Sequence, residues 1–96
     1  MAEFLVRIAV AVPADLDPAA RRELVAAERE LGRRLVEEGT IVRIWRVPGT
    51  TNNVGVWRAA DASALHAVLR SLPLAPWCTI DVTALAVHPL EGGAEA

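Results

Sequence analysis

Two helix-length segments, each flanked by short β-type runs, alternate along this 96-residue chain and restrict the folds open to it. The first segment begins at Asp17-Pro18, an N-cap followed by a proline suited to the first helical position. Gly39 supplies a C-terminal stop, so the spacing predicts a helix of about 20 residues. Asp61 or Ser63 caps a second, shorter helix, whose apolar stripe is Leu65, Val68, Leu69 and Leu72.

Four apolar or alternating runs surround these helices, over residues 4–12, 40–48, 54–57 and 79–83. The predicted element order is therefore β-α-β-β-α-β, the split βαβ unit of ferredoxin-like α+β folds. Two helices cover only one face of a four-stranded sheet, yet the run over 4–12 is apolar on both faces. We therefore expect another copy of the chain to cover the second face.

Composition excludes several classes of protein. Hydrophobic residues make up 53% and charged residues 23%, which is not the composition of a disordered chain. The longest apolar run, 8–14, is shorter than the roughly 20 residues of a membrane helix. The net charge of −2 argues against a nucleic-acid partner. We expect one domain over 1–90, with a frayed acidic tail over 91–96.

Neither a metal nor a cofactor is expected from the motifs. The single cysteine, Cys78, permits no internal disulfide, and no Cys/His cluster has the spacing of a structural zinc site. A glycine-rich phosphate loop and an activated Ser or Cys motif are also missing from the sequence. The N-terminal residues do not resemble a signal peptide, so the cytoplasm is the expected compartment. Cofactor-free chemistry or simple binding remains.

Glu28 is the best candidate for a catalytic group. It lies on the apolar stripe of the first helix, four residues after Leu24 and three before Leu31. A carboxylate packed against an apolar sheet is poorly solvated, which suits general acid–base chemistry near neutral pH. The alternative is a structural carboxylate at the edge of the stripe, paired with Arg7 or Arg46.

Alternation along the second strand places Ile41, Arg43, Trp45 and Val47 on one side and Val42, Ile44 and Arg46 on the other. Arg43 and Arg46 flank Trp45, so one of the two arginines faces inward. An inward arginine is suited to bind a substrate carboxylate through its planar guanidinium. The alternative is an ion pair with Glu28 or Asp81. The tryptophans are expected mainly in the core or at an interface.

Short motifs at ordered positions run through the chain from about residue 4 to residue 90. They are Val-Pro-Ala-Asp-Leu-Asp-Pro (12–18), Ala-Glu-Arg-Glu-Leu (27–31), Glu-Gly-Thr (38–40), Ile-Trp-Arg-Val-Pro-Gly (44–49), Leu-His (65–66), Ser-Leu-Pro-Leu-Ala-Pro-Trp (71–77), Ile-Asp-Val (80–82) and Val-His-Pro (87–89). Each motif is short, but the ordered set resembles the muconolactone Δ-isomerase family.

The resemblance implies a cofactor-free enzyme of the β-ketoadipate pathway, with a ferredoxin-like α+β sandwich of the dimeric α/β-barrel type. It implies a homo-oligomer, typically a decamer, and a small lactone substrate, with no nucleic-acid or membrane partner. The reaction would move a proton from the γ to the α carbon of a butenolide that carries an acetate side chain. By position, Glu28 matches the family's catalytic carboxylate, and Trp45, Arg46 and Asn53 match its substrate-binding positions. Arg43 is a further candidate for substrate binding, because its positive charge could bind the substrate carboxylate.

The chain departs from the family pattern at four places. They are Ile41-Val42 in place of Trp-Arg, Thr50-Thr51 after the hairpin glycine, Gly55-Val56-Trp57-Arg58 in place of Ser-Val-Phe-Asp, and Ala75-Pro76-Trp77 in place of Phe-Pro-Tyr. We expect these changes near the pocket, where they would alter the substrate. The resulting alternative is 5-chloromuconolactone dehalogenase, which shares the first proton abstraction.

Two other classes of function stay open because a fold does not determine an activity. A non-catalytic small-ligand or assembly protein predicts a solvated Glu28 and no pocket. A cofactor-free oxygenase of polycyclic phenols, also of the dimeric α/β-barrel type, predicts a large cavity lined by aromatic side chains.

Overall fold

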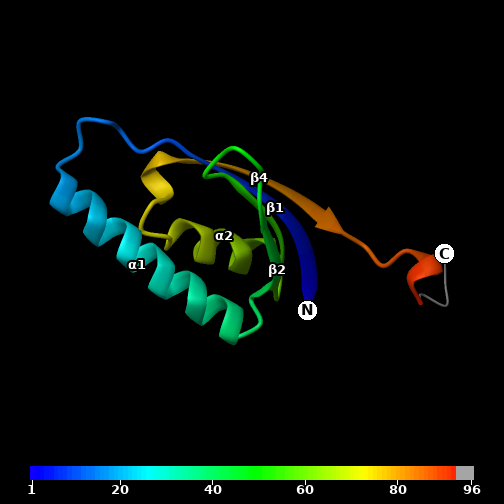
Figure 1. Cartoon of the computed structure of the whole chain (residues 1–96). Helices are drawn as coiled ribbons and strands as arrows, with labels where there is room; N and C mark the ends of the chain where they lie inside the picture. Colours follow the sequence, from blue (N-terminus) through cyan, green and yellow to red (C-terminus); the bar gives the residue numbers. More distant parts are fainter. Residues whose placement is uncertain (93–96) are drawn as a thin grey trace.

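The computed structural model describes residues 1–92 and contains a four-stranded sheet with two helices on one face (Figure 1). The strands are β1 (Ala2–Val10), β2 (Ile41–Arg46), β3 (Asn53–Ala59) and β4 (Cys78–Leu85). The helices are α1 (Pro18–Glu37) and α2 (Ala62–Arg70), and the short 3-10 turns are η1 (Ala75–Trp77) and η2 (Pro89–Glu91). The strand order is β2-β3-β1-β4, with every neighbouring pair antiparallel. The predicted element order and α+β class are confirmed.

The helix boundaries follow the capping residues of the sequence. The Asp17 carboxylate accepts a hydrogen bond from the Ala20 amide at 3.1 Å and so caps α1. Gly39, with a φ of 81°, adopts the left-handed conformation that follows a helix end. Asp61 rather than Ser63 caps α2. Both helices therefore begin where local chemistry predicts.

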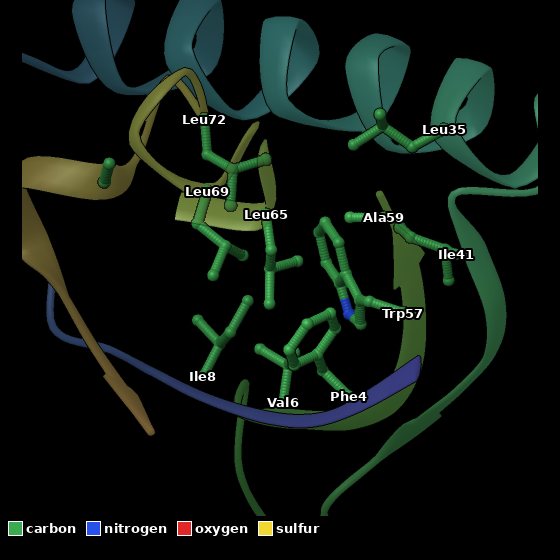
Figure 2. Packing of buried hydrophobic residues seen from close by; sticks show 11 residues of the cluster. Phe4, Val6, Ile8, Leu35, Ile41, Trp57, Ala59, Leu65, Leu69 and Leu72 are labelled. Carbon is green, nitrogen blue, oxygen red and sulfur yellow. The ribbon is translucent and has the colours of Figure 1, made fainter. Parts of the chain in front are cut away.

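One hydrophobic core lies between the sheet and the helices (Figure 2). The side chains that meet there include Phe4, Val6 and Ile8 of β1, Trp57 of β3, Leu65 and Leu69 of α2, Leu72 after α2, Leu35 of α1 and Ile41 of β2. Trp57 is only 1% exposed, and Figure 2 shows its indole between the leucines of α2 and Phe4. The apolar stripe predicted for α2 is therefore the face that packs on the sheet.

A β-bulge in β2 overturns part of the predicted alternation. The pairing of β2 with β3 shifts register between Ile41 and Arg43. The extra residue places Ile41 on the same face as Ile44 and Arg46, whereas Arg43 and Trp45 face the opposite side. The expectation that Ile41 shares a face with Arg43 and Trp45 is therefore wrong, because regular alternation fails at a bulge.

Gly55 of β3 pairs with Ile44, just beyond this bulge, and a side chain at residue 55 would clash with β2. A Cβ atom at this position would lie 2.6 Å from the Arg43 carbonyl oxygen and 3.3 Å from the Ile44 Cα. Both atoms belong to the backbone of β2, so they cannot swing away. The close approach of β2 to β3 requires glycine at residue 55.

The second face of the sheet carries no helix, and Figure 1 shows the chain leaving the sheet after β4 toward the C-terminal turn. Within residues 1–92, neither helix has the length and apolar character needed to cross a bilayer. The predicted tail over 91–96 lies mostly outside the described residues. Glu91 ends η2, and residues 93–96 are not described.

Candidate active site

Glu28 lies in the middle of α1 and is half-buried. Its Oε1 atom accepts a hydrogen bond of 2.9 Å from the backbone amide of Leu74, which lies just before η1. The bond links two parts of the chain that are 46 residues apart. Among residues 1–92, ion pairs join Arg33 to Glu30 and Glu37, and Arg58 to Glu3, but none includes Glu28. The alternative pairing of Glu28 with Arg7 or Arg46 is therefore not what the structure contains.

A cleft of about 450 Å³ opens beside this carboxylate. Its polar lining residues are Arg21, Glu28, Arg29, Arg46, Thr51 and Asn53. The other lining residues are Ile8, Val10, Ala11, Val12, Val25 and Leu74. The cleft therefore combines aliphatic walls with a few polar groups and has no aromatic side chain among its lining residues. This is the opposite of the aromatic-lined cavity that the oxygenase alternative predicts.

Arg46 and Asn53 reach the cleft from paired positions on β2 and β3. The Arg46 guanidinium donates a hydrogen bond to the Thr51 carbonyl oxygen. The Asn53 Oδ1 atom is buried and has no hydrogen-bond donor within the described part of the chain. The neighbouring Asn52 has a structural task instead, because its Oδ1 accepts from the Val10 amide at 3.1 Å.

Arg43 and Trp45 lie away from this cleft. The register with β3 places both on the face of the sheet that no helix covers. The Arg43 guanidinium carbon is 4.9 Å from the centroid of the Trp45 ring, a cation–π contact. Trp45 is 45% exposed. The structure thus brings together Glu28, Arg46 and Asn53, three of the five residues predicted from the sequence, but not Arg43 or Trp45.

Two arginines of α1 were missed as candidates, and helical periodicity alone could have found them. Arg21, Val25, Glu28 and Arg29 are spaced so that they share one face of the helix, and all four line the cleft. The Arg21 guanidinium donates to the Pro13 carbonyl oxygen. With Arg46 of β2, three arginines and one glutamate line the cleft, so its lining is suited to an anionic ligand.

Cys78, at the start of β4, is held in the neutral thiol form. Burial raises the pKa of its thiol, and the negative charge of Glu28 raises that pKa further. Because the thiolate is the reactive form of cysteine, this environment disfavours nucleophilic chemistry by Cys78. Cys78 is therefore best described as a small, partly buried hydrophobic side chain.

Most departures from the family pattern lie outside the cleft, contrary to expectation. Ile41 and Trp57 are cross-strand partners in the core, and Ala75 is also buried there. Thr51 is the departure that lines the cleft. The changes mainly alter packing, so they give little support to an altered substrate or to the dehalogenase alternative.

Comparison with known proteins gives one consistent family. The sequence profile of the family described as muconolactone delta-isomerase matches residues 2–91. The chain is 39% identical to the muconolactone Delta-isomerase of Rhodococcus opacus, over 92% of this chain and 95% of that protein. It is 40% identical to that of Pseudomonas putida, over 90% of each chain. A crystal structure of muconolactone isomerase superimposes with a TM-score of 0.85, at 41% identity over 91% of each chain. The chain therefore belongs to the muconolactone Δ-isomerase family of enzymes.

Proposed function

We propose that this protein isomerises muconolactone to its enol-lactone in catechol degradation, with Glu28 as the general base. The observation that carries the proposal is the half-buried Glu28 carboxylate at the wall of a cleft that Arg46 and Asn53 also line. The carboxylate has one neutral hydrogen-bond donor and no ion-pair partner among residues 1–92, so its negative charge is not neutralised by an arginine. Membership of the family supplies the substrate class.

The proposed reaction needs no cofactor. The γ carbon–hydrogen bond of the butenolide is acidified by conjugation with the lactone carbonyl. Glu28 takes this proton, the electron pair moves through the ring to the carbonyl oxygen, and a dienolate forms. The protonated Glu28 then gives the proton to the α carbon, which completes the shift of the double bond and regenerates the carboxylate. The atoms and electrons balance without an oxidant or a reductant.

The arginines of the cleft have a separate task in this proposal. Arg46 and Arg29 hold the acetate carboxylate of the substrate, which does not react, and orient the γ carbon toward Glu28. Asn53 donates through its side-chain amide toward the lactone, where negative charge develops in the dienolate. The aliphatic walls reduce the local dielectric and so strengthen these interactions.

We further propose that the protein acts as a homo-oligomer, with the decamer as the proposed assembly. The uncovered face of the sheet places Leu5, Val54 and Val56 beside Trp45. Charges of both signs lie on this face, including the Glu3–Arg58 ion pair and the cross-strand neighbours Arg7 and Asp81. When two copies meet around a two-fold axis, positive groups of one copy can face negative groups of the other, and the apolar side chains of both can pack together.

The test of the base role is Glu28→Gln, which keeps the shape of the side chain but cannot accept the γ proton. Loss of a general base costs about 10²- to 10⁴-fold in rate, so kcat on muconolactone should fall by that factor. Exchange of the γ proton in D₂O, followed by NMR, should slow by a similar factor. Glu23→Gln is the matched control, because Glu23 is an exposed carboxylate of α1 outside the cleft. Near-normal turnover by Glu28→Gln would exclude Glu28 as the base.

A further inference from the structure

We propose that the Leu74 amide makes the two oxygens of the Glu28 carboxylate unequal. Oε1 is the held oxygen, and Oε2 is the oxygen that takes the proton from the substrate. The Leu74 amide is a positioning group that acts through Glu28. This inference rests on the proposed role of Glu28 as the base and adds which oxygen reacts and what aims it.

The bond that holds Oε1 is partly buried. The donor residue, Leu74, is only 8% exposed, and Glu28 is half-buried. A hydrogen bond to an ionised acceptor is strong, and partial burial reduces the competition from water. Since Leu74 also lines the cleft, the held oxygen lies at the cleft wall. The same contact therefore fixes the side chain and leaves the second oxygen for the substrate.

The segment that carries the Leu74 amide is itself rigid. The Ala75 amide donates to the Leu72 carbonyl oxygen, and the Trp77 amide donates to the Leu74 carbonyl oxygen, each at 2.9 Å. Leu72 and Ala75 are both buried in the core at 5% exposure. Pro73 has no N–H group and cannot donate. The amide that this turn directs toward α1 is that of the next residue, Leu74. The Glu28 side chain has several rotatable bonds, and its carboxylate is thus held by a donor whose own position is set by the packing of the turn.

A single backbone amide suits a base better than an arginine would. An arginine in a bidentate ion pair occupies both carboxylate oxygens and strongly disfavours protonation. The amide binds one oxygen and carries no net charge. Arg29 and Arg46 line the same cleft, but neither forms an ion pair with Glu28 in the part of the chain that the structure describes. The arrangement separates the positioning of the base from the binding of the substrate carboxylate.

The experiment replaces the Leu74 N–H by an ester oxygen, through incorporation of leucic acid at residue 74. This keeps the buried side chain and removes only the donor. We expect kcat to fall roughly tenfold or more while KM for muconolactone changes little, since the bond positions the base and not the substrate. The acid limb of the pH–rate profile should move to higher pH, because the ionised carboxylate loses a hydrogen bond.

The matched control is the same leucic acid ester at Leu65, another buried leucine, which removes the hydrogen bond from the Leu65 amide to the Asp61 carbonyl oxygen in α2 and leaves the turn at Leu74 intact. It should lower thermal stability but leave kcat and the pH profile unchanged. If the Leu74 ester has a normal kcat and a normal pH profile while Glu28→Gln is inactive, the inference about Leu74 is wrong and the proposed base role of Glu28 stands. An active Glu28→Gln would overturn the proposed base role as well.

A second measurement uses the unmodified backbone and does not depend on the folding of an ester variant. The NMR shift of the Leu74 amide proton should titrate with pH in step with kcat/KM, and this titration should disappear in Glu28→Gln. A Leu74 amide shift that does not follow the kinetic titration would overturn the inference even if the ester protein fails to fold.

Discussion

Arg43 and Arg46 show how much a single residue's role depends on its face of the sheet. They are three positions apart in one strand, so alternation requires them to face opposite sides. The sequence supports either one as the inward cation. The pairing with Asn53 places Arg46 in the cleft, whereas Arg43 contacts the Trp45 ring on the uncovered face. Arg46 therefore becomes the candidate for substrate binding, and Arg43 the candidate for subunit contact.

Substitution of each arginine by methionine separates these roles. Arg46→Met should raise KM for muconolactone roughly tenfold to a hundredfold with a smaller change in kcat, because a spectator carboxylate is bound equally in substrate and transition state. Arg43→Met should leave both constants within about twofold when the protein is assayed as the intact oligomer. Steady-state kinetics on the two variants checks this, and equal effects at both positions would contradict the assignment.

At the scale of the elements, the β2–β3 pair brings two departures from the family pattern together. The resemblance described above implies tryptophan in place of Ile41 and phenylalanine in place of Trp57, and these two residues are cross-strand partners here. Both side chains are buried, at 5% and 1% exposure. We therefore expect the two departures to compensate each other in volume across the sheet.

A double-mutant cycle tests this compensation. Ile41→Trp should overpack the core and lower the free energy of unfolding by about 1–3 kcal/mol. Trp57→Phe should lower it as well, because it leaves unfilled space. The double variant should be more stable, by about 0.5–3 kcal/mol, than the sum of the two single effects on the free energy of unfolding predicts. Urea denaturation measures all four proteins.

The control for this cycle pairs Ile41→Trp with Trp77→Phe. Trp57 pairs with Phe4 near the start of β1, whereas the carbonyl oxygen of Trp77 bonds the Ala11 amide beyond its other end. Residues this far apart in the sheet should show additive effects on stability. Additive behaviour of Ile41→Trp with Trp57→Phe would instead show that the two sites do not compensate.

For the whole molecule, the decisive feature is the sheet face that the helices leave uncovered. Both helices pack on the side of Val6 and Trp57, and the opposite side presents Leu5, Val54 and Val56. Uncovered apolar surface on a small domain favours association. Trp45 and Arg43 do not line the cleft, and they lie on this same face. We therefore assign both residues to the proposed interface.

Val56→Asp should disrupt the assembly, because it places a charge at the centre of the proposed interface, between β1 and β2. We expect smaller species in sedimentation velocity at micromolar concentration. Val36→Asp is the control, since Val36 is an apolar residue of α1 that is already 51% exposed. It should sediment as the wild type does. A wild-type protein that sediments as a monomer would refute the proposed oligomer.

The sequence by itself determined the secondary structure and its order. The caps at Asp17 and Asp61 and the alternating apolar runs act within a few residues of chain, so local chemistry is sufficient to predict them. Glu28 was also identified in this way, because a carboxylate on a leucine stripe is unusual at the level of one helix turn. The family motifs added its catalytic interpretation, which the structure leaves as a proposal.

Only the tertiary structure decided which of these residues meet. The bulge in β2 reverses the alternation after Ile41, and no local signal distinguishes it from a regular strand. The hydrogen bond between Glu28 and the Leu74 amide joins α1 to a turn 46 residues away, so it depends on how both pack against the sheet. The exclusion of Trp45 from the cleft follows from the same packing. Contacts between distant parts of the chain are set by the whole fold, and for that reason the composition of the cleft could not be predicted from local patterns.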